Sequence, residues 1–184
     1  MMGHVENTGT DETLPPTRML RFDTPGELFE KIPELAEFVQ NAPEPHEDMG
    51  HYINRLRHSP TPEDAVTVIP FAMEPHIAVD WGVEAVQANL PEMSPDDMQL
   101  MNWVGEWLDM PNSQNRWGTL QRALFATRRS AAVYLALGVG WSGGPLAPND
   151  PVEMPLWRAP RAISSAVLRA LGQVALDHKD VAPR

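Results

Sequence analysis

Three short segments carry the same pattern, in which a hydroxyl residue and a proline precede an acidic residue. They are Thr24-Pro25-Gly26-Glu27, Thr61-Pro62-Glu63-Asp64 and Ser94-Pro95-Asp96-Asp97. In such a pattern the hydroxyl accepts from the amide of the third helical residue, and proline fits the first helical turn. The carboxylate reaches back to the cap and suits the positive end of the helix dipole. The pattern therefore predicts three helix starts, and Glu74-Pro75 predicts a fourth of the same kind.

Apolar residues after each start recur at the spacing of a helix with one buried face. Ala131–Leu137 is apolar on nearly every side, which predicts the most deeply buried helix. No segment shows the sustained alternation of a strand. We therefore predict an all-α fold, an irregular bundle of about seven to nine short helices. The similar spacing of the three starts leaves stacked helical hairpins as an alternative.

The length of 184 residues favours one compact domain. Residues 1–20 are polar and lack an apolar period, so we expect a disordered or loosely packed tail. Residues 21–184 are then expected to form a single α-helical domain.

Composition limits the compartment and the partners. There is no cysteine, which excludes disulfides and thiolate chemistry. The formal net charge is −11, so nucleic acid and anionic lipid are disfavoured as partners. The longest apolar run, Ala131–Trp141, is shorter than the ~20 residues that a membrane span needs, and the N-terminus lacks a secretory signal pattern. We expect a soluble, cytoplasmic protein.

The charge is also uneven along the chain. Residues 1–110 hold 21 of the 25 Asp and Glu residues, but only 5 of the 14 Lys and Arg residues. This asymmetry predicts either a solvated acidic face or a dipolar molecule that docks by its ends.

A glycine-rich stretch, Gly140–Pro148, resembles a phosphate-binding loop only superficially. The stretch contains no lysine, and a helix is expected to end there rather than to begin. Gly140-Trp141-Ser142-Gly143-Gly144 also meets the formal spacing of a nucleophile elbow, but no strand precedes it. Gly140, Gly143 or Gly144 is thus expected to end a helix. The alternative is an ordered loop that presents Trp141 to a partner.

The histidines do not form a recognisable metal site. His46 and His51 are five residues apart, so on a helix their rings point in different directions. His76 and Asp80 are four apart but have no obvious third ligand. We predict neither a metal nor a cofactor.

Four further residues are candidates for binding a partner. Trp141 and Trp157 flank a proline-rich segment and are the tryptophans expected to be partly exposed. Exposed tryptophans are favoured anchors at protein interfaces. Arg128 and Arg129 either cap the preceding helix or form a basic spot for an acidic partner. The predicted partner-binding set is Trp141, Ser142, Gly143, Gly144, Trp157, Arg128 and Arg129.

Two blocks of the chain form a combination that points to a family. The positions are Ala65, Val66, Ala78, Val79 and Trp81 in the first block, and Trp141, Ser142, Gly143 and Gly144 in the second. At these positions the chain resembles an uncharacterised all-helical bacterial family that is encountered beside type VI secretion genes. The resemblance covers roughly residues 60–175, and Asp80 departs from it where an apolar residue is expected. It implies a genomic setting and carries no catalytic residues.

These observations lead to one functional prediction with two alternatives. We expect a non-enzymatic helical protein-interaction module, a cytoplasmic accessory or adaptor factor of a type VI secretion system. Its partner would be a secretion component or an effector. The alternatives are an immunity protein whose acidic part masks a basic toxin site, and a small hydrolase that uses carboxylates or Ser142.

Overall fold

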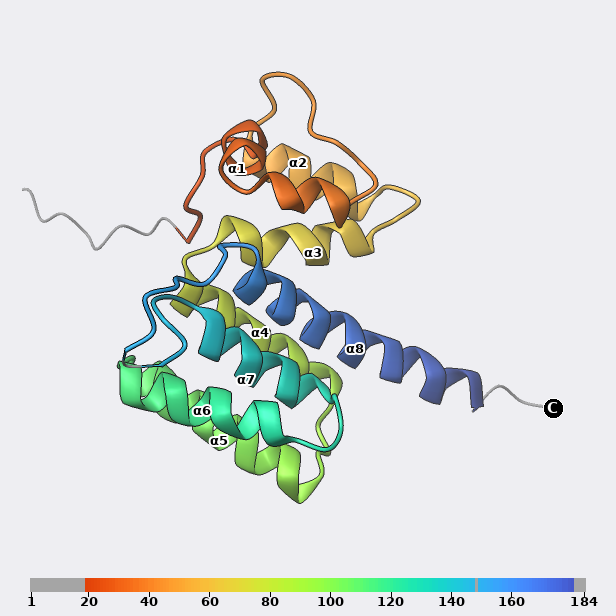
Figure 1. Ribbon diagram of the computed structural model, residues 1–184. Helices are drawn as coiled ribbons and strands as arrows, with labels where there is room; N and C mark the ends of the chain where they lie inside the picture. Colours follow the sequence, from red (N-terminus) through yellow and green to blue (C-terminus); the bar gives the residue numbers. More distant parts are fainter. Residues whose placement is uncertain (1–18, 148, 181–184) are drawn as a thin grey trace, which may run out of the picture.

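The computed structural model describes residues 19–147 and 149–180, and within them the chain is helical (Figure 1). These residues form α1 (Pro25–Lys31), η1 (a 3₁₀ helix, Pro33–Glu37), α2 (Met49–Arg57), α3 (Glu63–Ala72), α4 (Pro75–Asn89), α5 (Pro95–Asp109), α6 (Ser113–Phe125), α7 (Ala131–Trp141) and α8 (Arg158–Asp180). The described residues contain no strand, only two isolated bridges, Leu20–Met73 and Pro145–Glu153. The prediction of an all-α bundle is confirmed.

Most of the predicted tail, residues 1–18, lies outside the described residues. Met19 and Leu20 are described, and Leu20 is bridged to Met73. The amide of Arg21 donates to the carbonyl of Ala72 at 2.6 Å. The chain is therefore attached to the end of α3 from Leu20 onward.

At two of the three predicted starts the hydroxyl caps the helix as expected, and the reciprocal bond to the carboxylate forms at one of them, Thr24. Thr24 accepts from the amide of Glu27 at 3.2 Å, and Glu27 accepts in turn from the amide of Thr24. Ser94 accepts from the amide of Asp97 at 3.2 Å. The α4 helix begins at Pro75 as predicted, although Glu74 makes no side-chain cap bond. Local chemistry thus determines where these helices begin.

The prediction for Thr61 is wrong in its details. Its hydroxyl donates to the carboxylate of Asp64 instead of accepting from the Asp64 amide, and α3 has no side-chain cap. Asp64 is buried and accepts from the amides of Gln40 and Asn41 at 2.9 and 3.1 Å. The carboxylate therefore anchors the segment that follows η1, a long-range role that a local capping pattern cannot reveal.

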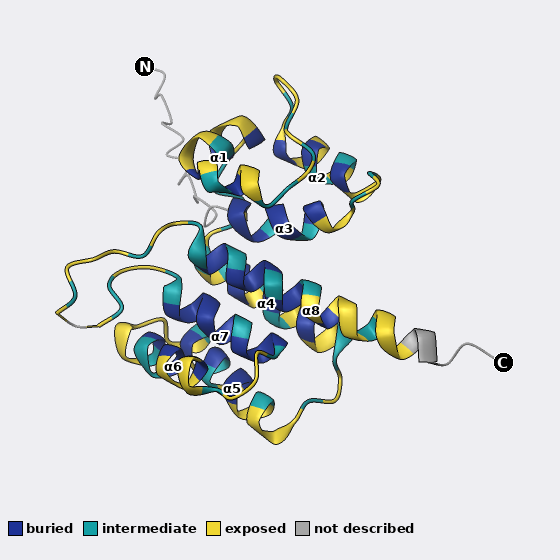
Figure 2. Cartoon of the chain, turned by 45° about the vertical axis from the view of Figure 1, so that its right-hand side comes forward, coloured by how far each residue is buried: buried dark blue, intermediate teal, exposed yellow. Residues whose placement is uncertain are grey.

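Buried apolar residues form two clusters. The N-terminal core joins α1, η1, α2 and one face of α3, and includes Leu28, Tyr52 and Phe71. The C-terminal core joins α4 to α8. Helix α8 packs against α3 as well as against α4 and α7, so it connects the two clusters (Figures 1 and 2).

Helix α7 lies at the centre of the C-terminal core, as its sequence predicts. Every residue from Ala131 to Gly140 except Tyr134 is buried, and the helix is dark blue along most of its length in Figure 2. It contacts α4, α5, α6 and α8. A central helix surrounded by others is a bundle, and not a stack in which each hairpin contacts only its neighbours.

Glycines make the close approach of these helices possible. A Cβ atom at Gly138 would lie 2.7 Å from Cγ1 of Ile163 in α8. At Gly140 it would lie 2.6 Å from Cβ of Leu120 in α6. Gly140 is thus inside α7, where it is needed for packing and not for ending the helix.

We predict that Gly140→Ala lowers the free energy of unfolding by about 1–3 kcal/mol, because the added methyl group overpacks the contact with Leu120. Urea unfolding followed by circular dichroism measures this change. Gly172→Ala is the matched control, since Gly172 lies in α8 with no atom within 4 Å of an added Cβ. The control should gain about 0.5–1 kcal/mol from the better helix propensity of alanine. Equal gains for both variants would contradict the packing role of Gly140.

Candidate interaction surface

The glycine-rich stretch ends α7 and turns the chain, as one of the two sequence interpretations predicted. Ser142 is the C-cap, and its hydroxyl donates to the carbonyl of Val139 at 2.7 Å. Gly143 and Gly144 have φ values of 148° and 68°, in the region where residues with a Cβ are strained. These two glycines are needed for the turn.

A buried arginine holds the start of the following loop. Arg116 is 6% exposed, and its two terminal nitrogens donate to the carbonyls of Gly140 and Pro145 at 2.9 and 2.6 Å. Trp117 Nε1 donates to the same Pro145 carbonyl at 3.1 Å. Burial lowers the pKa of Arg116 from its usual value. The guanidinium lies at the C-terminal end of α7, where the partial negative charge of the helix dipole stabilises a cation.

Trp141 and Trp157 are both half-buried, but so are Trp81, Trp103 and Trp117, so partial exposure does not distinguish the two tryptophans that the sequence singled out. The guanidinium of Arg158 lies 5.8 Å from the Trp141 ring and 5.7 Å from the Trp157 ring. Trp141 packs against the C-terminal core, and Trp157 packs against the N-terminal core. Trp157 also lies 6.1 Å from the Phe38 ring. The two indoles therefore contribute to packing at both ends of the loop, and their role in binding a partner stays a prediction.

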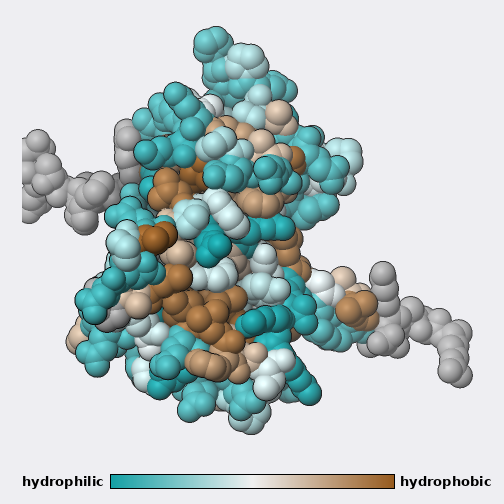
Figure 3. All heavy atoms as spheres, viewed as in Figure 1, coloured by the Kyte–Doolittle hydropathy of each residue, from teal (hydrophilic) through white to brown (hydrophobic). Residues whose placement is uncertain are grey.

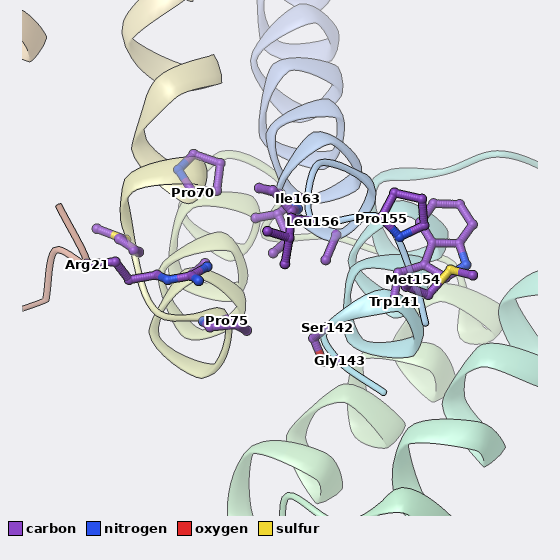
Figure 4. Close-up of a pocket in the computed structure, with 14 residues that line it drawn as sticks. Arg21, Pro70, Pro75, Trp141, Ser142, Gly143, Met154, Pro155, Leu156 and Ile163 are labelled. Carbon is purple, nitrogen blue, oxygen red and sulfur yellow. The ribbon is translucent and has the colours of Figure 1, made fainter. Parts of the chain in front are cut away.

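A narrow apolar slot lies beside this loop (Figure 4). Its walls include Pro70 and Pro75 on one side and Trp141, Met154 and Pro155 on the other. The volume is about 50 Å³, which is room for a few water molecules and too little for a substrate or a peptide. In the described residues no basic side chain is hydrogen-bonded to Ser142. The hydroxyl of Ser142 donates its hydrogen bond to the carbonyl of Val139 instead.

The described residues contain no group of three or more His, Asp or Glu side chains that could hold a metal ion. His46 precedes α2 and has a φ of 63°, so it does not share a helix with His51. His76 Nε2 lies 2.8 Å from the carbonyl oxygen of Leu108, and no bond joins it to Asp80. The buried side-chain nitrogen and oxygen atoms of the described residues all have hydrogen-bond partners.

The described chain has a much larger hollow, which is lined by residues from the start of α5, the end of α6 and the start of α7. These helix ends lie near one another at the N-terminal end of α7 (Figure 1). This α5–α6 cleft has a volume of about 680 Å³, within the range of ligand and peptide sites. The lining residues are Ser94, Asp96, Asp97, Gln99, Leu100, Trp103, Arg122, Phe125, Ala126, Thr127, Arg128 and Val133. The cleft thus combines an apolar floor with charged walls.

The apolar part of the α5–α6 cleft extends from the core to the surface. Leu100 and Val133 are buried, and Trp103 is half-buried. Phe125 is 80% exposed. A phenylalanine left in water at the edge of a cleft is an unfavourable arrangement that a docking partner would relieve.

The basic wall is formed by Arg122 and Arg128. The Cζ atom of Arg122 lies 3.5 Å from the centre of the Trp103 ring, and one terminal nitrogen donates to the carbonyl of Gly118 at 3.0 Å. These contacts orient the guanidinium. Arg129 instead donates to the carbonyl of Ala123 at 3.0 Å and caps α6. The two arginines therefore differ in role. Arg129 caps the helix, as the first interpretation predicted, and Arg128 lines the cleft.

Three residues of the cleft, Trp103, Arg122 and Phe125, are not among those that the sequence predicts for binding a partner. Trp103 lies in α5 and Arg122 lies in α6, so no spacing along the sequence indicates that the two side chains meet. Phe125 looks like any core residue in a sequence, and only its position at the last turn of α6 leaves it exposed.

The surface seen in Figure 3 is mostly hydrophilic, with hydrophobic residues gathered in a few places. One of them is the last part of α8, where Leu171 and Leu176 are 39% and 58% exposed. In the described chain, none of the helices has the length and apolarity that crossing a bilayer requires.

Fold and surface together define a class: an all-α helical bundle with a hollow of about 680 Å³ between the start of α5 and the end of α6. The chain belongs to DUF6931, a family of unknown function, whose model matches residues 52–184. The expectation of an uncharacterised family is thereby confirmed, and the match includes α3 to α8 with the whole α5–α6 cleft. No curated protein and no solved structure matches the chain.

We predict that Arg116→Met lowers the free energy of unfolding by about 2–3 kcal/mol, because the buried Gly140 carbonyl loses its charged donor. Hydrogen exchange of the amides from Ser142 to Ala147 should accelerate at the same time. Arg169→Met is the control, since Arg169 is exposed on α8, and it should change stability by less than about 0.5 kcal/mol. Unchanged exchange in the loop would show that Arg116 does not hold it.

Proposed function

We propose that the protein is a non-enzymatic protein-interaction module and that a partner docks in the α5–α6 cleft. The observation that carries the proposal is the cleft itself, where an oriented arginine, a tryptophan and an exposed phenylalanine come together. Trp, Arg and other large side chains of this kind dominate the binding energy of protein interfaces.

The contacts of the candidate chemical groups also support this proposal. The hydroxyl of Ser142 ends a helix, and the carboxylates of Asp64 and Glu27 hold backbone amides. Groups used in this way are not poised as nucleophile, acid or base, so the hydrolase alternative finds no support in these contacts.

The finer assignment is a cytoplasmic adaptor whose partner is a component or an effector of a type VI secretion system. Its support is the resemblance of the two sequence blocks around Ala65–Trp81 and Trp141–Gly144. An immunity protein remains the alternative, in which the acidic N-terminal half and not the cleft would contact a basic toxin.

The proposal predicts site-specific cross-linking in the cells from which the protein comes. A photoreactive phenylalanine analogue at position 125 should capture one protein, since that side chain lies at the cleft edge. The same analogue at Arg169, exposed on α8, is the control and should not capture it. Mass spectrometry of the cross-linked species identifies the partner.

Three results would count against the proposal. Capture of the same protein from both positions would indicate non-specific contact, and no capture from position 125 would indicate that the cleft is not a docking surface. Capture only from an exposed acidic position such as Glu30 in α1 would favour the immunity alternative.

A further inference from the structure

The arginines of the α5–α6 cleft lack an ion-pair partner in the described chain, whereas its aspartates are stabilised by other groups. This difference favours a negatively charged partner over a positively charged one. Neither Arg122 nor Arg128 makes an ion pair within the described chain, where the arginines that do are Arg21 and Arg55. Arg122 uses one nitrogen for the carbonyl of Gly118 and keeps its other donors for a ligand. Arg128 is exposed in the turn between α6 and α7. Two guanidinium groups thus face the cleft without a carboxylate of their own.

The acidic residues of the same cleft are better compensated. Asp97 accepts a hydrogen bond from the hydroxyl of Ser130, which is the N-cap of α7. Asp96 and Asp97 also lie in the first turn of α5, where the helix dipole stabilises negative charge. The negative charge of these carboxylates is therefore already stabilised within the protein, whereas the two arginines make no ion pair in the described chain. A ligand that brings carboxylates would stabilise the arginines.

The arginine that stacks on Trp103 is suited to a carboxylate. A guanidinium presents parallel N–H donors that match the two oxygens of a carboxylate, and stacking on an indole fixes its plane. Phe125 and the apolar floor at Leu100 lie beside it and would accept an apolar side chain. The surface therefore fits a chain segment in which Asp or Glu residues flank an apolar anchor.

We propose that the α5–α6 cleft binds an acidic segment of a partner protein, with its carboxylates on Arg122 and Arg128 and an apolar side chain beside Phe125. This inference rests on the proposed function and adds the chemistry of the partner to it. Nucleic acid offers negative charge as well, but the net charge of −11 on the whole chain repels a long polyanion more strongly than a short segment.

The test is a selection of random peptides displayed on phage against the folded full-length protein. The charge-reversed variant Arg122→Glu/Arg128→Glu serves for counter-selection. Peptides that depend on the cleft should be rich in Asp and Glu around one or two large apolar residues. Measured singly by fluorescence anisotropy, they should bind the charge-reversed variant at least about tenfold more weakly than the wild type. Raising the salt concentration should weaken their binding to the wild type, because salt screens the attraction between carboxylate and arginine.

Two further variants separate the cleft from a general effect of charge. Arg169→Glu changes the net charge by the same amount per residue but lies outside the cleft, so it should leave binding nearly unchanged. Phe125→Ser should weaken binding without altering the preference for acidic peptides. Thermal unfolding of each variant verifies that the exposed substitutions leave the fold intact.

Several outcomes would overturn the inference. These are enrichment of basic or neutral peptides, no enrichment that depends on the cleft, and tighter binding of a labelled single-stranded oligonucleotide than of any peptide at the same two arginines. Concentration-dependent dimers that disappear in Phe125→Ser would show that a second copy occupies the cleft. If position 125 still cross-links a partner while the selected peptides are not acidic, the proposed function stands and this inference alone fails.

Discussion

The structure depends on the burial of one helix that has no polar side. Because α7 is apolar around its whole circumference, water is unfavourable on every face, and the bundle surrounds it with α4, α5, α6 and α8. Gly138 and Gly140 allow the neighbouring helices to approach so closely that even a methyl group would collide. The order of the C-terminal helices follows from this requirement, and α8 extends the same packing to α3 and the N-terminal core.

Because α7 is buried as far as Gly140, carbonyls near its C-terminal end are shielded from water and need other donors. At the C-terminal end of α7, Arg116 and Ser142 provide them. At the N-terminal end, Ser130 caps α7 through its acceptance from Val133 and also donates to Asp97 of α5. Arg116, Ser130 and Ser142 therefore make hydrogen bonds that cap the two ends of α7. This explains why Ser142, a serine between glycines, has a structural role here.

Helix ends also produce the surface that remains open. The α5–α6 cleft lies where α6 stops at Phe125 and the chain turns into α7. Phe125 stays exposed there, although Ala123 in the same helical turn is buried. Capping by Arg129 orders this turn and leaves Arg128 directed to the cleft lining. A packing requirement of the core thus exposes aromatic and basic groups at one place.

The sequence by itself determined the local features: the helix starts at Thr24 and Ser94, the burial of α7, the turn at Gly143 and Gly144, and the all-α class. Each of these depends on residues close together in the chain, whose capping bonds, periodicity and backbone freedom act locally. Only the tertiary structure decided that Asp64 anchors a distant segment, that Arg116 holds the loop after α7, and that Trp103, Arg122, Phe125 and Arg128 line one cleft. Those contacts join residues from separate helices, and their meeting follows from the packing of the whole bundle rather than from any pattern along the chain.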